Sequence, residues 1–194
     1  MKPEQRRYSL LLASSAERFN SALPSLLPES LYFPITVATD VAGARRRLLE
    51  NKYDIVIVNT PLTDDFGTRL ALDICESSGA GVLLLVKAEH YPDINARVSP
   101  FGVLAVSKPT TPQIITQSLT LLCATRERLR RMEEKTASIE EKMEDIRVVN
   151  RAKCLLIEQL RMTEKEAHRF IEKQAMDRCV TKRAVAENII STYK

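Results

Sequence analysis

The chain has 194 residues, of which 44% are hydrophobic and 28% are charged, and its formal net charge is +4 at pH 7. These values predict a globular protein with room for one ordinary domain and a smaller one. No run approaches the roughly 20 apolar residues that cross a bilayer, and the first apolar run is too short for a secretory signal, so we expect a cytoplasmic protein.

The first 110 or so residues alternate short apolar runs with stretches of helical period, which is typical of parallel strands separated by helices. The runs IVIV and VLLLV are apolar at successive positions, as expected of strands covered on both faces. The expected strands are Tyr8 to Ala13, Ile35 to Ala38, Asp54 to Val58, Val82 to Val86 and Val103 to Val106. The sequence therefore predicts a five-stranded α/β domain over residues 1–121.

A long helix is predicted from about Thr111 and Pro112, because threonine can cap its first turn and no proline or glycine follows Pro112. A heptad repeat begins at Leu122 and predicts a coiled-coil linker over residues 122–145 that joins two copies, with a single exposed helix as the alternative. The a positions are Leu122, Leu129, Thr136, Met143 and Asn150, and the d positions are Thr125, Met132, Ile139 and Ile146. Asn150 would favour a defined register.

Two further helices are predicted within residues 146–194, each with a start signal. Thr163 and Glu166 are spaced as a capping box, and Thr181 can cap the last helix. Apolar residues recur at helical spacing in both helices and at the end of the long helix, which predicts a small three-helix core. We expect this core to contain Val149, Ala152, Leu156, Leu160, Ala167, Phe170, Ile171, Ala175, Val185, Ala186, Ile189 and Ile190.

The N-terminal pattern resembles the receiver domain of two-component response regulators over about Tyr8 to Leu122, and this resemblance implies a flavodoxin-like parallel sheet. Receivers hold magnesium with an acidic pair after the first strand. They carry a phosphoacceptor aspartate after the third strand, a hydroxyl residue after the fourth and Lys-Pro after the fifth. Lys108 and Pro109 match the last feature, so Lys108 is the retained receiver lysine.

The other receiver positions depart from the family pattern. Asn59 stands at the phosphoacceptor position, and an amide is not a nucleophile that can take a phosphoryl group. Ser14 and Ser15 or their neighbours replace the acidic pair, so magnesium should bind weakly or not at all. Lys87 occupies the hydroxyl position and Ala105 the position of an expected aromatic residue. The sequence thus predicts a pseudo-receiver that is not phosphorylated at the usual site and serves in dimerisation or partner docking.

Two carboxylates, Asp64 and Asp65, follow Asn59 closely and are candidate substitute acceptors or metal ligands. Their place beyond the strand end favours turn carboxylates that cap the next helix. Lys108 and Asn59 are expected to keep a plain hydrogen bond.

The run from Asn150 to Ile190 resembles the ANTAR domain. The family pattern has Ala-Lys-Gly-x-Leu, Thr or Ser before Glu, Ala before an aromatic, Gln-Ala-Met, and Val-Ala followed by two aliphatics. The matching residues here are Ala152-Lys153-Cys154-Leu155-Leu156, Thr163-Glu164, Ala167-His168, Gln174-Ala175-Met176 and Val185-Ala186-Glu187-Asn188-Ile189-Ile190. Cys154 and His168 depart from the pattern without disturbing a helix. The resemblance implies a transcription antitermination regulator whose ANTAR module binds paired RNA stem-loops in nascent leader transcripts.

The chain's positive excess lies in this same segment, because residues 146–194 hold 11 basic and 6 acidic residues whereas residues 1–145 hold 18 and 19. Basic side chains there are candidate phosphate contacts, with an ordinary solvated surface as the alternative. These candidates are Lys153, Arg161, Lys165, Arg169, Lys173, Arg178, Lys182 and Arg183. His168 either contacts a base or is a partly buried structural residue.

Two functional hypotheses remain from the sequence. The first is a dimeric RNA-binding antiterminator, and the alternative is a protein-interaction adaptor that uses the pseudo-receiver and helical tail without binding RNA. No paired-carboxylate, Cys/His, Ser/His or phosphate-loop arrangement is present, so neither an enzyme nor a cofactor is predicted. The four cysteines are widely spaced and no histidine cluster accompanies them, so no metal site is predicted either.

Overall fold

The computed structural model describes residues 6–193. The first five residues, part of the stretch considered as a secretory signal, and Lys194, the end of the predicted RNA-binding module, lie outside them. The chain divides into two compact units, residues 1–131 and residues 132–194. Within residues 6–193, no helix has the length and apolar character needed to cross a membrane.

The N-terminal unit contains a five-stranded parallel sheet with the strand order β2-β1-β3-β4-β5. Its strands are β1 (Tyr8–Ser14), β2 (Tyr32–Ala38), β3 (Ile55–Asn59), β4 (Gly81–Lys87) and β5 (Leu104–Lys108). The central strands β1, β3 and β4 are buried along almost their whole length, as their continuous apolar runs indicate. The predicted five-stranded α/β fold is confirmed. The largest difference is at β2, which starts at Tyr32 instead of Ile35 because Tyr32 pairs with Tyr8 of β1.

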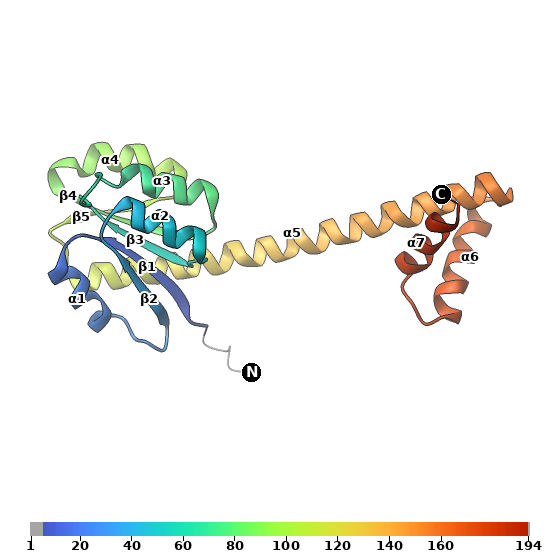
Figure 1. Cartoon of the computed structure of the whole chain (residues 1–194), viewed down its shortest axis with the longest axis horizontal. Coiled ribbons are helices and arrows are strands. Elements are labelled where there is room, and N and C mark those ends of the chain that lie inside the picture. Colours follow the sequence, from blue (N-terminus) through green and yellow to red (C-terminus); the bar gives the residue numbers. More distant parts are fainter. Residues whose placement is uncertain (1–5, 194) are drawn as a thin grey trace. The chain divides into compact units, whose positions relative to one another are not determined.

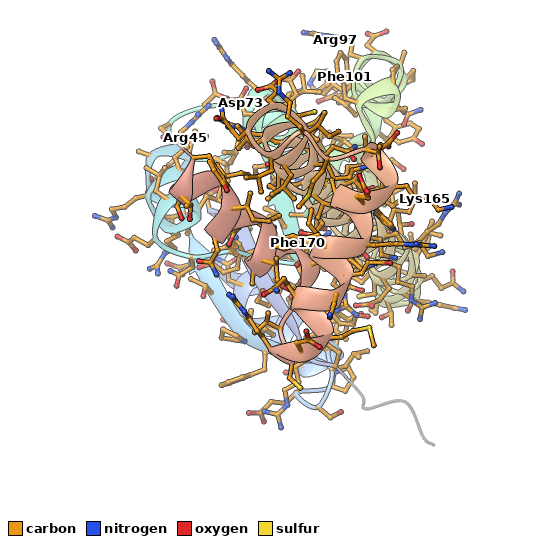
Figure 2. The ribbon with its side chains drawn as sticks, turned by 90° about the vertical axis from the view of Figure 1, so that its right-hand side faces the viewer. Arg45, Asp73, Arg97, Phe101, Lys165 and Phe170 are labelled. Atoms are coloured by element: carbon orange, nitrogen blue, oxygen red, sulfur yellow. The ribbon has the colours of Figure 1, made fainter. Side chains whose placement is uncertain are left out.

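Helices cover both faces of this sheet (Figure 1). On one face lie α1 (Glu17–Leu26) and the start of α5 (Pro112–Leu160), which bury Leu23 and Leu119 in one apolar cluster. On the other face lie α2 (Val41–Glu50), α3 (Thr68–Ser77) and α4 (Tyr91–Val98), which form the second cluster. Two short 3₁₀ turns, η1 (Ala88–His90) and η2 (Ser99–Phe101), flank α4. An ion pair between Arg45 of α2 and Asp73 of α3 links two helices of this second face (Figure 2).

The long helix α5 changes its surroundings along its length. Leu122, the first predicted a position, is buried in the N-terminal core, where its side chain packs beside Gly81 at the start of β4. Its assignment to the seam is therefore wrong. From Leu129 onwards the apolar heptad positions are exposed. The apolar stripe of α5 that is open to solvent therefore begins at Leu129.

The C-terminal unit is a three-helix arrangement of the end of α5, α6 (Glu164–Asp177) and α7 (Lys182–Thr192). Both predicted start signals are present. The Glu166 amide donates to Thr163 Oγ1 (3.3 Å), and Glu166 Oε2 accepts from the Thr163 amide (2.8 Å). This second bond, with one from the Thr163 hydroxyl, lowers the pKa of the Glu166 carboxyl. Thr181 Oγ1 accepts from the Ala184 amide (3.2 Å) and caps α7.

Two residues of the predicted three-helix core are misplaced. Phe170 is 37% exposed, because Ala167, Ile171 and Ala175 already take the inward face at four-residue spacing and Phe170 lies to one side of it. Leu160 is 45% exposed, because α5 ends there and the chain turns away at Arg161. Met162, which was not predicted, packs against the core in this region.

Candidate functional site

A hydrogen-bonded cluster lies at the carboxyl ends of β1, β3 and β5, where the receiver positions meet. Ser14 and Asn59 are buried and lie opposite each other in the sheet register. Asn59 Nδ2 donates to Ser14 Oγ (3.0 Å), and Lys108 Nζ donates to Asn59 Oδ1 (2.7 Å) and to the Thr60 carbonyl oxygen. The expected bond between Lys108 and Asn59 is therefore present, and the cluster ties three strands together with neutral groups and one cation.

This cluster contains one cation and no carboxylate, whereas a magnesium site supplies negatively charged oxygen ligands. Partial burial, and then the charge of Lys87 opposite it on β4, lower the pKa of Lys108. Lys87 itself is exposed, and its Nζ lies 3.6 Å from Glu89 Oε1. Magnesium prefers charged oxygen ligands, whereas Ser14 and Asn59 offer neutral oxygens that already take part in hydrogen bonds. The residues at these positions do not fit the metal, and residues 6–193 contain no other group of His, Cys, Asp and Glu that could hold one.

The two carboxylates after β3 have structural partners. Asp64 accepts from the amides of Val41 (2.7 Å) and Ala42 (3.1 Å), so it caps the start of α2. The bond from Val41 contributes most to a lowered pKa of the Asp64 carboxyl. Asp65 accepts from the Gly67 amide (2.7 Å), directly before α3. Both residues are turn carboxylates, as predicted, but neither caps the next helix. Asp64 caps the preceding helix because the loop folds back over α2, and Asp65 closes the turn before α3.

We expect no phosphoryl group on Asn59 after incubation with acetyl phosphate and magnesium. The amide nitrogen has no nucleophilic lone pair and already donates to Ser14. Intact-mass measurement with peptide mapping tests this result, and a response regulator with an intact acidic site in the same tube serves as the positive control. An adduct at Asn59 would contradict the prediction.

The eight basic residues predicted in the C-terminal unit fall into two groups. Lys153 Nζ lies 3.2 Å from Glu164, Lys182 is paired with Glu172, and Arg183 Nη1 lies 2.9 Å from Asp145 while its Nε lies 2.8 Å from Glu187. The others are exposed and have no carboxylate partner among the residues that the structure describes. These unpaired residues are Arg161, Lys165, Arg169, Lys173 and Arg178. Three cations thus form ion pairs that link the helices of the unit. The other five are exposed and have no carboxylate partner in the described structure.

Three of the unpaired cations follow one line along α6. Lys165, Arg169 and Lys173 are four residues apart, so they lie on the same face of the helix. Ala167 and Ile171 face the core on the other side. Figure 2 shows Lys165 and Phe170 on the ribbon of α6. We call Lys165, Arg169 and Lys173 the basic ridge.

The turn between α6 and α7 forms an exposed corner, residues 176–181. In the Gln-Ala-Met segment Ala175 packs inward, whereas Met176 is 77% exposed. Cys179 has a left-handed backbone (φ 51°), and the amide of Val180 donates to the Ala175 carbonyl oxygen (3.0 Å). The sequence could not show which residue of the segment faces outward, because the answer depends on the rotation of α6 against the core.

His168 lies on the surface of α6. Its side chain is about half exposed, and its Nε2 lies 3.3 Å from Glu172 Oε1. The helix rotation that buries Ala167 leaves His168 at the rim of the core, where its half-exposed side chain lies beside Glu172. A contact between His168 and a base stays a prediction.

Known proteins are similar to both the N-terminal and the C-terminal unit of the chain. Residues 137–190 match the model of the ANTAR domain. The transcriptional regulatory protein PdtaR of Mycobacterium tuberculosis is 27% identical over 184 residues, which cover 94% of this chain and 89% of that relative. This similarity extends through both units.

Solved receiver structures share the fold of the N-terminal unit. The receiver domain of an HD domain-containing protein from Pseudomonas fluorescens superposes with a TM-score of 0.58 and 24% identity, covering 65% of this chain and 93% of that one. The chemotaxis response regulator CheY4 of Vibrio cholerae gives a TM-score of 0.53 and 16% identity, covering 60% and 99%. The chain therefore carries a C-terminal segment that matches the ANTAR domain, is similar to the regulatory protein PdtaR along most of its length, and has an N-terminal domain of the receiver fold.

Proposed function

We propose that this protein is an RNA-binding transcription antitermination regulator that acts in the cytoplasm as a homodimer. In this proposal residues 1–121 form a pseudo-receiver, residues 122–145 a linker helix whose coiled-coil seam begins at Leu129, and residues 146–194 the RNA-binding module. The observation that carries the proposal is the basic ridge, a line of unpaired cations on a unit that matches the ANTAR domain. Such a line suits a polyanion, because each cation can replace a condensed counterion at a phosphate. The role is one of binding, without catalysis or a cofactor.

The exposed apolar stripe of α5 supports a homodimer. Met132, Ile139 and Met143 are each more than half exposed, and Leu129 and Ile146 continue the stripe at the heptad a and d positions. Such a stripe on a helix whose other faces are charged is typical of a coiled-coil seam. We propose a second copy of this chain as its partner, because the seam is self-complementary along its length and Asn150 continues it at an a position. The other positions between residues 131 and 144 are polar and exposed apart from Ala137.

In this proposal a second copy can bind the seam while the C-terminal module binds RNA. Within the C-terminal unit, Asp145, Val148, Val149, Ala152 and Leu156 form the side of α5 that meets α6 and α7. At about 100° per residue, this side lies about 130° around the helix from the seam at Met143 and Ile146. A second helix on the seam would therefore leave the three-helix core intact. Each copy would present its own module, and two linked modules gain avidity on adjacent stem-loops.

The receiver-fold domain would keep one conformation without phosphorylation. The bonds from Lys108 to Asn59 and from Asn59 to Ser14 join the positions at which a receiver carries its phosphorylation chemistry. A domain fixed in this way can serve dimerisation or partner docking, and control of RNA binding would come from protein concentration, a partner or a ligand.

Titration of the full chain with an RNA that carries tandem hexaloop stem-loops, over a series of salt concentrations, tests the proposed function. We expect sub-micromolar binding that weakens steeply as salt rises. An arbitrary hairpin of equal length is the control. Equal affinity for the two RNAs would reject the antiterminator and favour a protein-interaction adaptor.

A further inference from the structure

We propose that the corner between α6 and α7 reads the unpaired loop of the RNA, with Met176 and Val180 against unstacked bases and Arg178 on a neighbouring phosphate. This inference rests on the proposed function and assigns to the corner a role that differs from that of the basic ridge. The ridge supplies attraction that does not depend on sequence or shape. The corner supplies contacts that only a loop can offer.

Exposure of apolar side chains at the corner is the first observation. Met176 is the most exposed large apolar side chain of the C-terminal unit, and Val180, four residues further on, is also exposed. Neither side chain contributes to the three-helix core. Together, Met176 and Val180 leave apolar surface at one turn open to contact with another molecule. Methionine is unbranched and polarisable and adapts to flat partners such as aromatic rings.

Charge at the corner favours an anionic partner such as a nucleic acid over a basic or neutral protein surface. Arg178 and Lys173 are exposed, and neither has a carboxylate partner among the described residues. Three of the four carboxylates of α6 are already engaged, Glu164 with Lys153, Glu166 with Thr163 and Glu172 with Lys182. Asp177 is the remaining carboxylate on this helix. The free charge around Met176 is therefore positive, which matches a phosphate backbone.

Hydrogen bonds and an ion pair connect the residues of the corner to the helices on either side of it. The amides of Arg178, Cys179 and Val180 donate to the carbonyl oxygens of Gln174, Met176 and Ala175, at 3.2, 3.1 and 3.0 Å. The ion pair between Lys182 and Glu172 and the cap of α7 by Thr181 close it on either side. A fixed backbone lowers the entropy lost on binding. Met176 and Val180 are thus presented on a hydrogen-bonded turn.

The shape of RNA determines which part of the RNA this turn can contact. The major groove of a paired A-form stem is too narrow for side chains, whereas the bases of a loop can be splayed out and stacked on apolar side chains. An apolar corner flanked by cations fits a loop with its phosphates on either side. The stem is left to the basic ridge, whose cations need only phosphates.

The experiment compares a Met176→Ala, Val180→Ala double variant of the full chain with the wild type, on the tandem hexaloop RNA and on a fully paired RNA of equal charge. We expect about tenfold weaker binding to the hexaloop RNA, with an unchanged dependence on salt and an unchanged affinity for the paired RNA. A Lys173→Gln variant should instead lower the slope of log affinity against log salt by about 1.4 to 1.8 on both RNAs, because each copy of the dimer loses one phosphate contact.

Leu160→Ala is the matched control. Leu160 is an exposed apolar side chain at the start of α6, whereas the corner lies at its end, about 20 Å away for a helix of this length. Far-UV circular dichroism should be the same for all variants, because none of the replaced side chains is in the core. Wild-type affinity of the double variant for the hexaloop RNA would overturn the inference while leaving the proposed function intact. Equal losses on both RNAs would also overturn it, and failure of the wild type to bind either RNA would remove both proposals.

Discussion

Replacing Ile139 and Met143 by glutamate should separate the protein into monomers and weaken its binding to tandem stem-loop RNA by about a hundredfold. Both side chains are more than half exposed and occupy adjacent d and a positions of the seam. In a dimer of parallel helices each glutamate would face its copy across the seam, so the two carboxylates repel each other without water around them. The helix itself should remain, because glutamate has a high helix propensity.

Sedimentation or light scattering measures the mass, and a titration with one stem-loop beside the tandem RNA measures the avidity. Binding to a single stem-loop should change little, since the module lies on another side of α5. The matched control replaces Ala137 and Ser138 by glutamate, which adds the same charge to the same stretch at positions outside the seam. A dimer that survives in the seam variant, or an equal effect in the control, would argue against this interface.

The fold was largely predictable from local patterns. Continuous apolar runs such as IVIV of β3 predict strands buried on both faces, because a parallel sheet needs covering helices. The capping box at Thr163 and the cap at Thr181 predict where α6 and α7 begin. Each signal involves residues that are only three positions apart in the sequence. Each of these features depends on neighbours in the sequence.

The errors arise where a residue's surroundings depend on distant parts of the chain. Phe170 has the spacing of a core residue, but the rotation of α6 that buries Ala167 and Ile171 places it at the surface. Asp64 caps α2, which precedes it in the chain, because the loop after β3 passes over the start of that helix. Leu122 fits a heptad, yet it packs on the sheet. Periodicity shows that one face of a helix is apolar, but it does not show which element packs against that face.

The candidate site shows the same division. The sequence predicted eight of the module's basic residues as candidate phosphate contacts, because charge can be counted. It could not separate Lys153, Lys182 and Arg183, which hold carboxylates of other elements or turns, from the unpaired cations of the basic ridge. Pairing depends on how α5, α6 and α7 pack. It also found no role for Met176, whose exposure became evident only from the packed helices.

Neutralising two of the three cations of the basic ridge is expected to have an effect as large as that of breaking the seam. With Arg169→Gln and Lys173→Gln together, binding to the tandem RNA should weaken by about a hundredfold near physiological salt, because the dimer loses four phosphate contacts. The slope of log affinity against log salt should fall by about 3 for the tandem RNA and by about half of that for one stem-loop. Both replaced side chains are exposed and unpaired in the described structure, and glutamine keeps the helix propensity, so stability should hold.

The control for the basic ridge removes two exposed cations from the N-terminal unit, Arg46→Gln with Lys52→Gln. This variant has the same net charge as the ridge variant, so it measures the part of the effect that comes from the overall field of the protein. Since exposed charges farther apart than about 8 Å are screened at physiological ionic strength, the control should bind almost as the wild type does. If instead both variants lost the same affinity and the same salt slope, RNA would be attracted by the charge of the whole chain, and the line of cations on α6 would not be its binding surface.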